Sequence, residues 1–495
     1  MGGIRLNRLK LRILAATLAA LLLVPLFAAC GEKPAVTTDP AASETTAPEG
    51  YTLPTYNFEG HEFNILSVGR KTVVENDFLY DDKSPSVLDA AVERRNRAVE
   101  GLYNIKIVTE QKDSTANQQS PEAYRALVRE ATAGDYTYDA CVIPGYDVSQ
   151  LAYEGYLTDL GILPYFDAEN EWYDQSANKT FRFADTLFFT TGDFGINMMD
   201  QAYCVAFNKD LAAQYHVENL YDLVNDDEWT LEKMYSIAKD VSDDTDGDSV
   251  TDVYGLLYWV DAVYGVVNAA GQRMVTLNDT TNTYELTLNT ETTYNVLELF
   301  YNMTHDSRTS LMYQHNSAAK EYVATFSGNK ALFFMTTIGT LSDFRDMETD
   351  YGILPYAHYS EQQTVYESTV APYYMNFLCV PLLVEDEART SAILEAIGYY
   401  SHAYIVPAYY EKTLMGQYTR DEESAEMLDI IFANRAYDLG YCYQPANLNK
   451  NLIYLLQSGS FDWSSRYASL EQPASIILGV ISEAYRRSLG IGTEQ

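Results

Sequence analysis

Side chains able to bind a polyhydroxylated ligand follow two of the predicted strands of this sequence. Tyr146 and Asp147 come directly after one apolar run, and Glu75 and Asp77 come after another. In α/β sheets, ligands lie beyond the carboxyl ends of the strands. An aromatic ring can cover the apolar face of a sugar, and a carboxylate accepts hydrogen bonds from its hydroxyl groups. These four residues are candidates for ligand binding; for Tyr146 and Asp147 the alternative is a plain turn followed by a helix cap.

A second group of carboxylates is typical of a metal site. Asp244, Asp246, Asp248 and Asp252 alternate with small residues and resemble an EF-hand-type calcium loop. The segment departs from that pattern because a glycine is at the fourth position instead of the sixth, and another glycine replaces the bidentate Glu. No cofactor is expected to be required; this loop is a candidate site for a structural calcium ion, and the alternative is an exposed turn that carries a run of charges.

Catalytic signatures are missing from the sequence. It contains no HExxH, GxSxG or GxGxxG motif and no phosphate-binding loop, and its 6 His residues are scattered. We therefore predict a protein that is not an enzyme. Two carboxylates in an acidic cleft could still hydrolyse a glycosidic bond, so a surface glycoside hydrolase or lyase is the alternative.

The charge balance excludes several classes of partner. The 495 residues include 33 Lys plus Arg against 70 Asp plus Glu, which gives a formal net charge of −37 at pH 7. Such a surface repels nucleic acids and anionic membranes. A hydrophobic fraction of 47% with 21% charged residues is typical of a globular protein. The length predicts roughly two to four domains.

The N-terminus predicts export and anchoring. Four basic residues precede an apolar run that ends immediately before Cys30, a pattern that resembles the lipobox of bacterial lipoproteins. Residues 1–29 would then be a signal peptide, and residues 30–50 a lipidated Cys30 with a flexible linker rich in Pro and Thr. We expect a protein held by lipid at the extracellular face of the cell membrane; an ordinary secretory signal is the alternative.

The other four cysteines show no metal-binding or redox spacing. Cys141, Cys204, Cys379 and Cys442 lie far apart in the chain, and three of them are in apolar runs. They are predicted to be buried thiols, and their disulfide state is left open.

Strand and helix patterns alternate along the first part of the chain. Residues 63–68, 105–108 and 138–143 are predicted strands, and helices are expected after Pro85 and Pro121. Ser84 is the expected cap of the first of these helices. This alternation predicts a parallel, doubly wound α/β sheet, and a second α/β unit begins near Tyr203.

The order of short motifs resembles one known family. The motifs, in chain order, are Tyr153-Glu154-Gly155-Tyr156-Leu157, Phe207-Asn208-Lys209, Trp229-Thr230, Phe326-Ser327-Gly328 and Tyr351-Gly352-Ile353-Leu354-Pro355. Their order over roughly residues 55–490 is similar to that of the extracellular solute-binding lipoproteins of bacterial ABC-type sugar importers, the group that contains the maltodextrin-binding proteins. The resemblance implies a two-lobe periplasmic-binding-protein-like α/β fold of type II, with hinged lobes and a central cleft.

The resemblance also implies domain boundaries. The first lobe would contain residues 51–196 and 378–432, and the second lobe residues 197–377 and 433–495. Strands or loops would cross between the lobes near 192–203, near 373–377 and around 433–443.

Five further candidates for ligand binding depend on this arrangement. Asp200 lies at the first expected crossing, and the second lobe would contribute Trp259, Thr337, Trp463 and Arg466. Trp463 stands in a polar stretch, where a stacking platform and packing in the core are equally compatible with the pattern.

The resemblance implies a binding protein, expected to be a monomer, that captures a carbohydrate and delivers it to the permease subunits of an ABC transporter. An oligosaccharide is the expected ligand, and the protein would meet the membrane only through its lipid. A peptide-binding receptor of the same fold is a further alternative.

Overall fold

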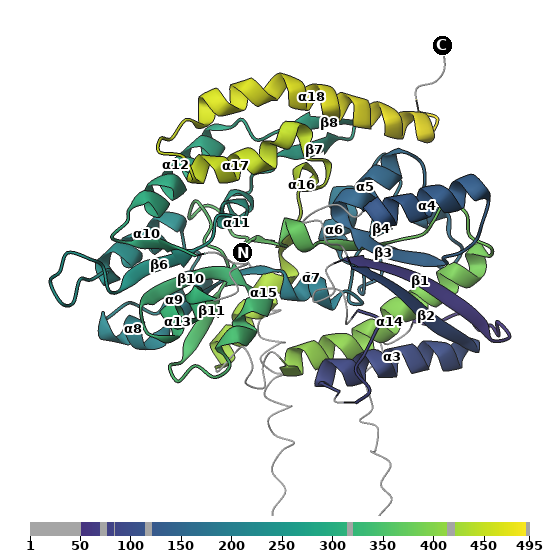
Figure 1. Ribbon diagram of the computed structural model, residues 1–495, viewed down its shortest axis with the longest axis horizontal. Helices are drawn as coiled ribbons and strands as arrows, with labels where there is room; N and C mark the ends of the chain where they lie inside the picture. Colours follow the sequence, from purple (N-terminus) through teal and green to yellow (C-terminus); the bar gives the residue numbers. More distant parts are fainter. Residues whose placement is uncertain are drawn as a thin grey trace, which may run out of the picture. The chain divides into compact units, whose positions relative to one another are not determined.

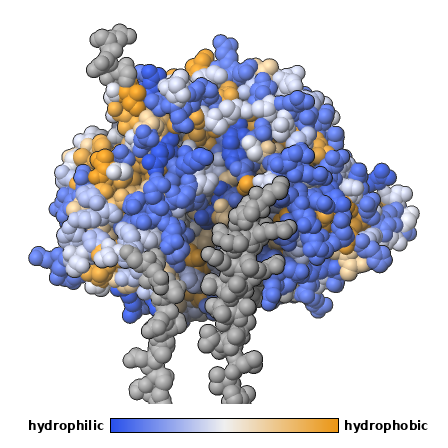
Figure 2. Space-filling view, turned by 180° about the vertical axis from the view of Figure 1, so that it is seen from behind, coloured by the Kyte–Doolittle hydropathy of each residue, from blue (hydrophilic) through white to orange (hydrophobic). Residues whose placement is uncertain are grey.

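The computed structural model describes residues 51–69, 77–83, 85–113, 121–313, 320–412 and 421–491 (Figure 1). The predicted signal peptide, Cys30, the linker and Glu75 lie outside the described residues. Within the described ranges, no helix is both long and apolar enough to cross a membrane. Figure 2 shows that hydrophilic side chains dominate the visible surface, with apolar ones in scattered patches.

The first sheet has five strands in the order β2-β1-β3-β13-β4. Their bounds are Ile105–Asp113 for β2, His61–Gly69 for β1, Ala140–Pro144 for β3, Asn376–Cys379 for β13 and Phe189–Thr190 for β4. Strands β1, β2 and β3 are parallel, whereas β13 is antiparallel to both of its neighbours. The strand β13 comes from late in the chain, after all five strands of the second sheet.

Helices cover both faces of the first sheet. They are α3 (Val87–Tyr103) and α14 (Glu387–Lys412) on one face, and α4 (Pro121–Ala133) and α5 (Gly145–Tyr153) on the other (Figure 1). The alternation along β1 decides which side chain faces which layer, because successive residues of a strand point to opposite faces. Phe63 and Ile65 belong to one apolar core, and Leu66 and Val68 belong to the other. These elements form the first lobe.

The second sheet has the order β11-β5-β10-β6-β9. Its strands are Tyr351–Leu354 (β11), Tyr203–Asn208 (β5), Ala331–Thr337 (β10), Tyr254–Tyr258 (β6) and Ser310–Met312 (β9). The helices around it are α8 (Lys209–Gln214), α9 (Leu220–Asn225), α10 (Leu231–Val241), α11 (Ala262–Ala269), α12 (Glu291–His305) and α13 (Glu321–Ser327). Strand β5 is antiparallel to β11 and β10. This second lobe confirms the predicted architecture of two α/β units.

Local capping explains where several helices begin. Asn208 accepts the N–H of Leu211 at the start of α8, and Thr230 accepts the N–H of Lys233 at the start of α10; both residue types are favoured as helix N-caps. The prediction of Ser84 as the cap of α3 was wrong. Ser86 caps that helix in a capping box with Asp89, because a Ser three residues before an acidic side chain satisfies two free N–H groups at once.

The chain passes between the sheets where the crossings were predicted. It leaves the first sheet after β4, runs through α7 (Ile196–Asp200) and enters the second sheet at β5; it returns between β11 and β13. A short parallel ladder, β12 (Ser368–Thr369) with β14 (Arg435–Ala436), joins two further connecting segments. The structure thus ties two sheets together through extended chain and one short helix, which is how hinged lobes are built.

The expected domain boundaries differ from the packing in the last quarter of the chain. Helix α14 packs on α3 of the first lobe, but α15 (Glu422–Ala433) packs beside β11 of the second, where Ser424 Oγ accepts the N–H of Ile353 at 3.1 Å. The assignment of residues 378–432 to the first lobe is therefore corrected at α15. An amphipathic pattern shows that a helix face is buried but not which sheet buries it.

The final helices are α16 (Leu439–Tyr443), α17 (Leu448–Leu456) and α18 (Trp463–Ser488). Helix α16 contacts α5 of the first lobe, and α18 contacts both α5 and the hairpin of β7 (Val275–Asn278) and β8 (Thr283–Leu286). The C-terminal segment therefore touches elements of both lobes. Cys141, Cys204, Cys379 and Cys442 are buried free thiols.

A buried carboxyl group in α14 holds the beginning of the described chain. Glu395 accepts hydrogen bonds from Tyr51 Oη at 2.8 Å and from Tyr173 Oη at 3.2 Å. The side-chain amide of Asn170 and the N–H of Asp167 also donate to it. Burial raises the pKa of Glu395 to about 7 although these four donors favour the charged form. The segment that leads to the N-terminus is therefore fastened to the first lobe.

This raised pKa predicts how stability changes with pH. The folded chain keeps a proton on Glu395 up to about pH 7, whereas the unfolded chain releases it near 4.5. The free energy of unfolding should therefore fall as the pH rises from about 4.5 to 7, by roughly 2–3 kcal/mol for this one group. Urea denaturation at several values between pH 5 and 8 measures this change in the free energy of unfolding.

The variant Glu395→Gln removes this titrating group, so its free energy of unfolding should change less between pH 5 and 8. Glu411→Gln, at an exposed position on the same helix, is the matched control and should leave the slope unchanged. A free energy of unfolding that rises from pH 5 to 8, or equal slopes in the two variants, would contradict the prediction.

Candidate functional site

Aromatic rings and a carboxyl group from both lobes meet between the two sheets. We call Tyr146, Asp261, Tyr264, Tyr373 and Tyr441 the interlobe cluster. The ring of Tyr264 lies edge-on to that of Tyr441, with centroids 4.8 Å apart, and its hydroxyl is 3.0 Å from that of Tyr373. Burial raises the pKa of Tyr146, and the charges that raise it further are those of Tyr373, Cys442 and Asp261. Tyr146 thus lies within electrostatic reach of a carboxyl group from the other lobe.

Strand ends explain why these side chains converge. Tyr146 lies in the first turn of α5, two residues after the end of β3, and Asp261 lies three residues after the end of β6. One strand end from each sheet therefore contributes to the interlobe cluster. Tyr373 and Tyr441 come from the connecting segments, the first from a 3-10 turn before β13 and the second from α16.

Hydrogen-bonding groups in the interlobe cluster are left without partners among the described residues. The hydroxyls of Tyr146 and Tyr441 are buried and accept or donate no hydrogen bond within the described chain. Buried phenol groups normally find a partner, so these two oxygens are suited to meet a polar ligand. Burial also raises the pKa of Tyr441 above its usual value, and the phenols stay neutral and can both donate and accept.

Asp261 is the acceptor of the interlobe cluster. Burial raises its pKa to about 7, while a hydrogen bond from Trp259 favours the charged form. Trp259 itself lies edge-on to Tyr203, with ring centroids 5.0 Å apart. The rings of Tyr356 and Tyr203 pack directly against the backbone of Gly265, because a Cβ there would lie 2.3 Å from the first ring and 2.7 Å from the second.

A second polar group lies at α7, where the chain crosses. Asp77 is 2% exposed and accepts the N–H of Asn197 at 3.4 Å. Burial raises the pKa of Asp77 to about 7. At the other end of α7, Asp200 accepts a hydrogen bond of 2.7 Å from Tyr409 Oη. The Asn197 amide donates to the carbonyl of Tyr374, the neighbour of Tyr373, so the α7 group adjoins the interlobe cluster.

The position of Asp77 has a structural cause. The buried guanidinium of Arg95 in α3 donates to the Asp77 carbonyl at 2.5 Å and to Ser401 Oγ of α14 at 3.1 Å. Its charge also favours the ionised form of the Asp77 carboxyl, after burial and the Asn197 hydrogen bond in importance. One arginine therefore fastens two helices of the first lobe to the segment that reaches the crossing.

The structure brings several of the predicted ligand-binding residues together. Tyr146, Asp77 and Asp200 lie in the two groups just described, and Trp259 contacts Asp261. Thr337 is buried at the end of β10 opposite Tyr203, and its hydroxyl is 2.9 Å from that of Thr340. Asp147 is 3% exposed beside Tyr146 in the first turn of α5.

Two predicted residues lie elsewhere. Trp463 is 2% exposed at the start of α18, where its ring packs near that of Tyr467 with centroids 5.6 Å apart. Arg466 pairs with Asp462 at 3.1 Å on the same helix. Trp463 therefore follows the packing alternative, because the pattern of a polar stretch does not reveal that a helix begins there and buries its first ring.

Sequence reasoning missed Asp261, Tyr264, Tyr373 and Tyr441. Asp261 follows the end of β6, so the strand-end rule that selected Tyr146 would have found it once that strand was recognised. Tyr373 and Tyr441 lie in the predicted crossings, where every inward ring is a candidate. Tyr264 gives no signal of its own, since it looks like any buried residue of an apolar helix.

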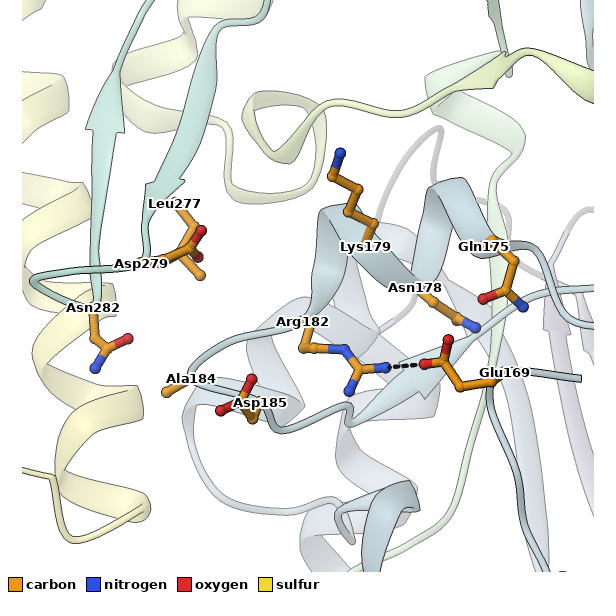
Figure 3. Close-up of a pocket in the computed structure, with 10 residues that line it drawn as sticks. All are labelled: Glu169, Gln175, Asn178, Lys179, Arg182, Ala184, Asp185, Leu277, Asp279 and Asn282. Atoms are coloured by element: carbon orange, nitrogen blue, oxygen red, sulfur yellow. Dashed lines mark hydrogen bonds and ion pairs between the residues drawn. The ribbon is translucent and has the colours of Figure 1, made fainter. Parts of the chain in front are cut away.

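A separate cavity of about 600 Å³ lies between α6 (Gln175–Phe181) and the β7–β8 hairpin. Figure 3 shows Leu277, Asp279 and Asn282 of the hairpin facing residues of the first lobe, with Arg182 paired to Glu169 at 3.1 Å. Its lining residues mix both charges and include no aromatic ring. It therefore offers no platform for a sugar face, and none of the predicted site residues lines it.

The Asp-rich loop has part of the geometry of a cation site. Asp244, Asp246 and Asp252 each bring a carboxylate oxygen to within 4.8 Å of the others, whereas Asp248 is not in this group. Asp244 also accepts the N–H groups of Gly247 and Ser249, each at 2.8 Å. With one oxygen each, three carboxylates supply three of the six to eight oxygens that calcium takes, so carbonyls or water would complete the shell. Calcium binding stays a prediction.

Comparisons with solved structures identify proteins of similar fold. No protein-family model and no curated protein matches the chain. Among solved structures, UspC from Mycobacterium tuberculosis is 13% identical, with a TM-score of 0.55 over 83% of this chain and 100% of its own. UgpB from the same organism, in complex with glycerophosphocholine, is 12% identical, with a TM-score of 0.55 over 84% of this chain and 98% of its own.

A family 1 extracellular solute-binding protein from Bifidobacterium longum subsp. infantis is 12% identical, with a TM-score of 0.52 over 86% of this chain and 99% of its own. These alignments span both lobes of the described chain. The chain therefore has the two-lobed α/β fold of these three proteins, among them an extracellular solute-binding protein, as its motif order predicted.

The Asp-rich loop generates a prediction for metal binding. Adding Ca²⁺ at about 2 mM, above the dissociation constants of roughly 10⁻⁴–10⁻³ M typical of extracellular calcium modules, should raise the melting temperature by about 1–2 °C over buffer with a chelator. Asp246→Asn should abolish that rise, and Asp226→Asn, at an exposed position elsewhere, should keep it. An equal melting temperature with calcium and with chelator would contradict the prediction.

Proposed function

We propose that this chain is an extracellular substrate-binding protein that captures a carbohydrate between its lobes and delivers it to an ABC transporter permease. The observation that carries the proposal is the interlobe cluster, in which rings, phenol hydroxyls and a carboxyl group from both sheets converge. This combination matches a sugar, which has apolar C–H faces surrounded by hydroxyl groups.

The interlobe cluster favours a neutral ligand over an anionic one. Its charged member is an acid, Asp261, and it contains no base. Arg273 influences the pKa of Tyr441, but its guanidinium is already paired with Glu367 at 2.7 Å. A ligand with a phosphate or carboxylate group would therefore meet repulsion from Asp261 without a free cation nearby. UgpB, whose structure contains glycerophosphocholine, shares the fold but need not share the ligand.

Capture would require the lobes to move. The extended chain on either side of α7 is able to absorb a hinge rotation, and a ligand that contacts both lobes shifts the population toward the closed state. The permease would then recognise the closed form, because closure changes the relative position of the two lobes and so the combined surface that they present. Asp77 at one end of α7 and Asp200 at the other would keep this helix fixed during the motion.

A lipid at Cys30 would hold the protein at the extracellular face of the membrane. The predicted linker ends where Tyr51 is bound by Glu395 in α14, so the tether would attach to the first lobe and leave the second free to move. The protein is proposed to act as a monomer.

A glycoside hydrolase remains the competing function for one specific reason. Asp77 and Asp261 are both carboxyl groups whose pKa burial raises to about 7, which is a property of general acids in glycosidases. Capture and hydrolysis differ in outcome, because only hydrolysis changes the sugar.

Calorimetric titration against a panel of oligosaccharides tests the proposal. At least one sugar should bind saturably and be recovered unchanged. Asp261→Asn keeps the size of the side chain but removes the charged acceptor, and it should weaken binding roughly 10–150-fold, which corresponds to a loss of about 1.5–3 kcal/mol.

Asp240→Asn, an exposed residue at the C-terminal end of α10, is the matched control and should bind as the unmodified protein does. Release of shorter sugars would favour the hydrolase. A panel in which no sugar binds, or equal affinity in both variants, would reject the proposed site.

A further inference from the structure

A groove of about 540 Å³ lies between α5, the segment around α16 and helix α18. We call it the α18 groove. Its volume is within the range of roughly 300–1,000 Å³ that small-molecule sites occupy. Figure 1 shows α18 running above α5 and α16, so the groove lies under the C-terminal helix.

The α18 groove has an apolar wall that faces solvent. Ile476 is 60% exposed, Val480 is 66% exposed and Ile477 is 38% exposed, all on α18. Large aliphatic side chains that are grouped and exposed beside a groove are typical of a binding surface, whereas single ones are not. This wall would shield the apolar part of a ligand from water.

The opposite side of the α18 groove carries rings and amides. Tyr146 and Tyr153 of α5 line it, together with Gln150 on the same helix and Asn447 beyond α16. Lys450 is the one charged residue among its lining residues. In a chain with a net charge of −37, a groove without carboxylates is suited to a neutral ligand that offers both apolar faces and hydroxyl groups.

The α18 groove adjoins the interlobe cluster. Tyr146 belongs to both, since it lines the groove while Tyr373 and Asp261 act electrostatically on the pKa of its hydroxyl. Adjacent residues of α16 belong to the two sites: Tyr441 packs against Tyr264 in the interlobe cluster, and Cys442 lines the groove. A chain-like ligand that passes Tyr146 would therefore continue from one site into the other.

We propose that the α18 groove binds the distal sugar units of the same oligosaccharide whose first units occupy the interlobe cluster. This inference rests on the proposed function. It makes the protein selective for chain length: short sugars fill the interlobe cluster alone, and longer ones gain additional contacts with the aliphatic wall, Tyr153 and the amides of the α18 groove.

Calorimetric titration with maltooligosaccharides, cello-oligosaccharides and xylo-oligosaccharides of about two to six units tests the inference. Within the series that binds, affinity should rise at least about tenfold between the shortest and the longest member, equivalent to about 1.4 kcal/mol. Val480→Ser together with Tyr153→Ala should remove this gain and leave the affinity for the shortest member unchanged, because neither residue belongs to the interlobe cluster.

Val365→Ser together with Tyr454→Ala provides the matched control. These residues are 48% and 51% exposed and lie outside the α18 groove, so the full dependence on length should remain. Melting temperatures of both double variants show whether each one is folded, and single variants replace any that is not.

The outcomes separate the two proposals. Binding that is independent of chain length, or a gain that survives in the α18-groove variant, would overturn the inference while leaving carbohydrate capture intact. A loss of length dependence in the control variant as well would also overturn it. If no sugar of any length binds, the proposed function itself fails.

Discussion

The path of the chain between the two sheets is the constraint on which the rest of this structure depends. The first sheet takes its strand β13 from chain that has already run through all five strands of the second sheet, so it cannot gain its full set of strands without that return. Buried hydrogen bonds hold helix α7 at both ends. Asp77 accepts the backbone N–H groups of Ile196 and Asn197 at its start, and Tyr409 Oη donates to Asp200 at its C-terminal end. Because a buried carboxyl group without partners is costly, these contacts determine where the strand ends of the two lobes meet.

The same arrangement explains the electrostatics of the interlobe cluster. Burial opposes the charged forms of Asp77 and Asp261 and raises the pKa of each to about 7, while the hydroxyls of Tyr146 and Tyr441 have no partner among the described residues. A polyhydroxylated ligand would supply donors to the acids and partners to the phenols at once. Binding would then reduce the free-energy cost of burying these carboxyl and hydroxyl groups. This gives a physical reason for the lobes to close around a sugar.

Local patterns in the sequence predicted the strands and helices that begin the first lobe and the start of the second α/β unit. Tyr146 could be placed at the edge of its sheet because a buried strand precedes it. Packing between distant elements was harder. The amphipathic pattern of α15 does not say which sheet it covers, and that of α18 does not say that Trp463 is buried at its first turn. Tyr264 joins the interlobe cluster only through the three-dimensional arrangement of its helix.

The distance between the lobes, with and without ligand, tests the central claim most directly. Arg97 on α3 and Asp240 on α10 are exposed, one in each lobe, and the four described cysteines are buried, so Arg97→Cys and Asp240→Cys together allow selective spin labelling. Pulsed electron paramagnetic resonance then measures the separation of the two labels. The account predicts a shorter distance once a sugar that binds by calorimetry is saturating. An unchanged distance distribution with that sugar bound would contradict capture by closure of the lobes.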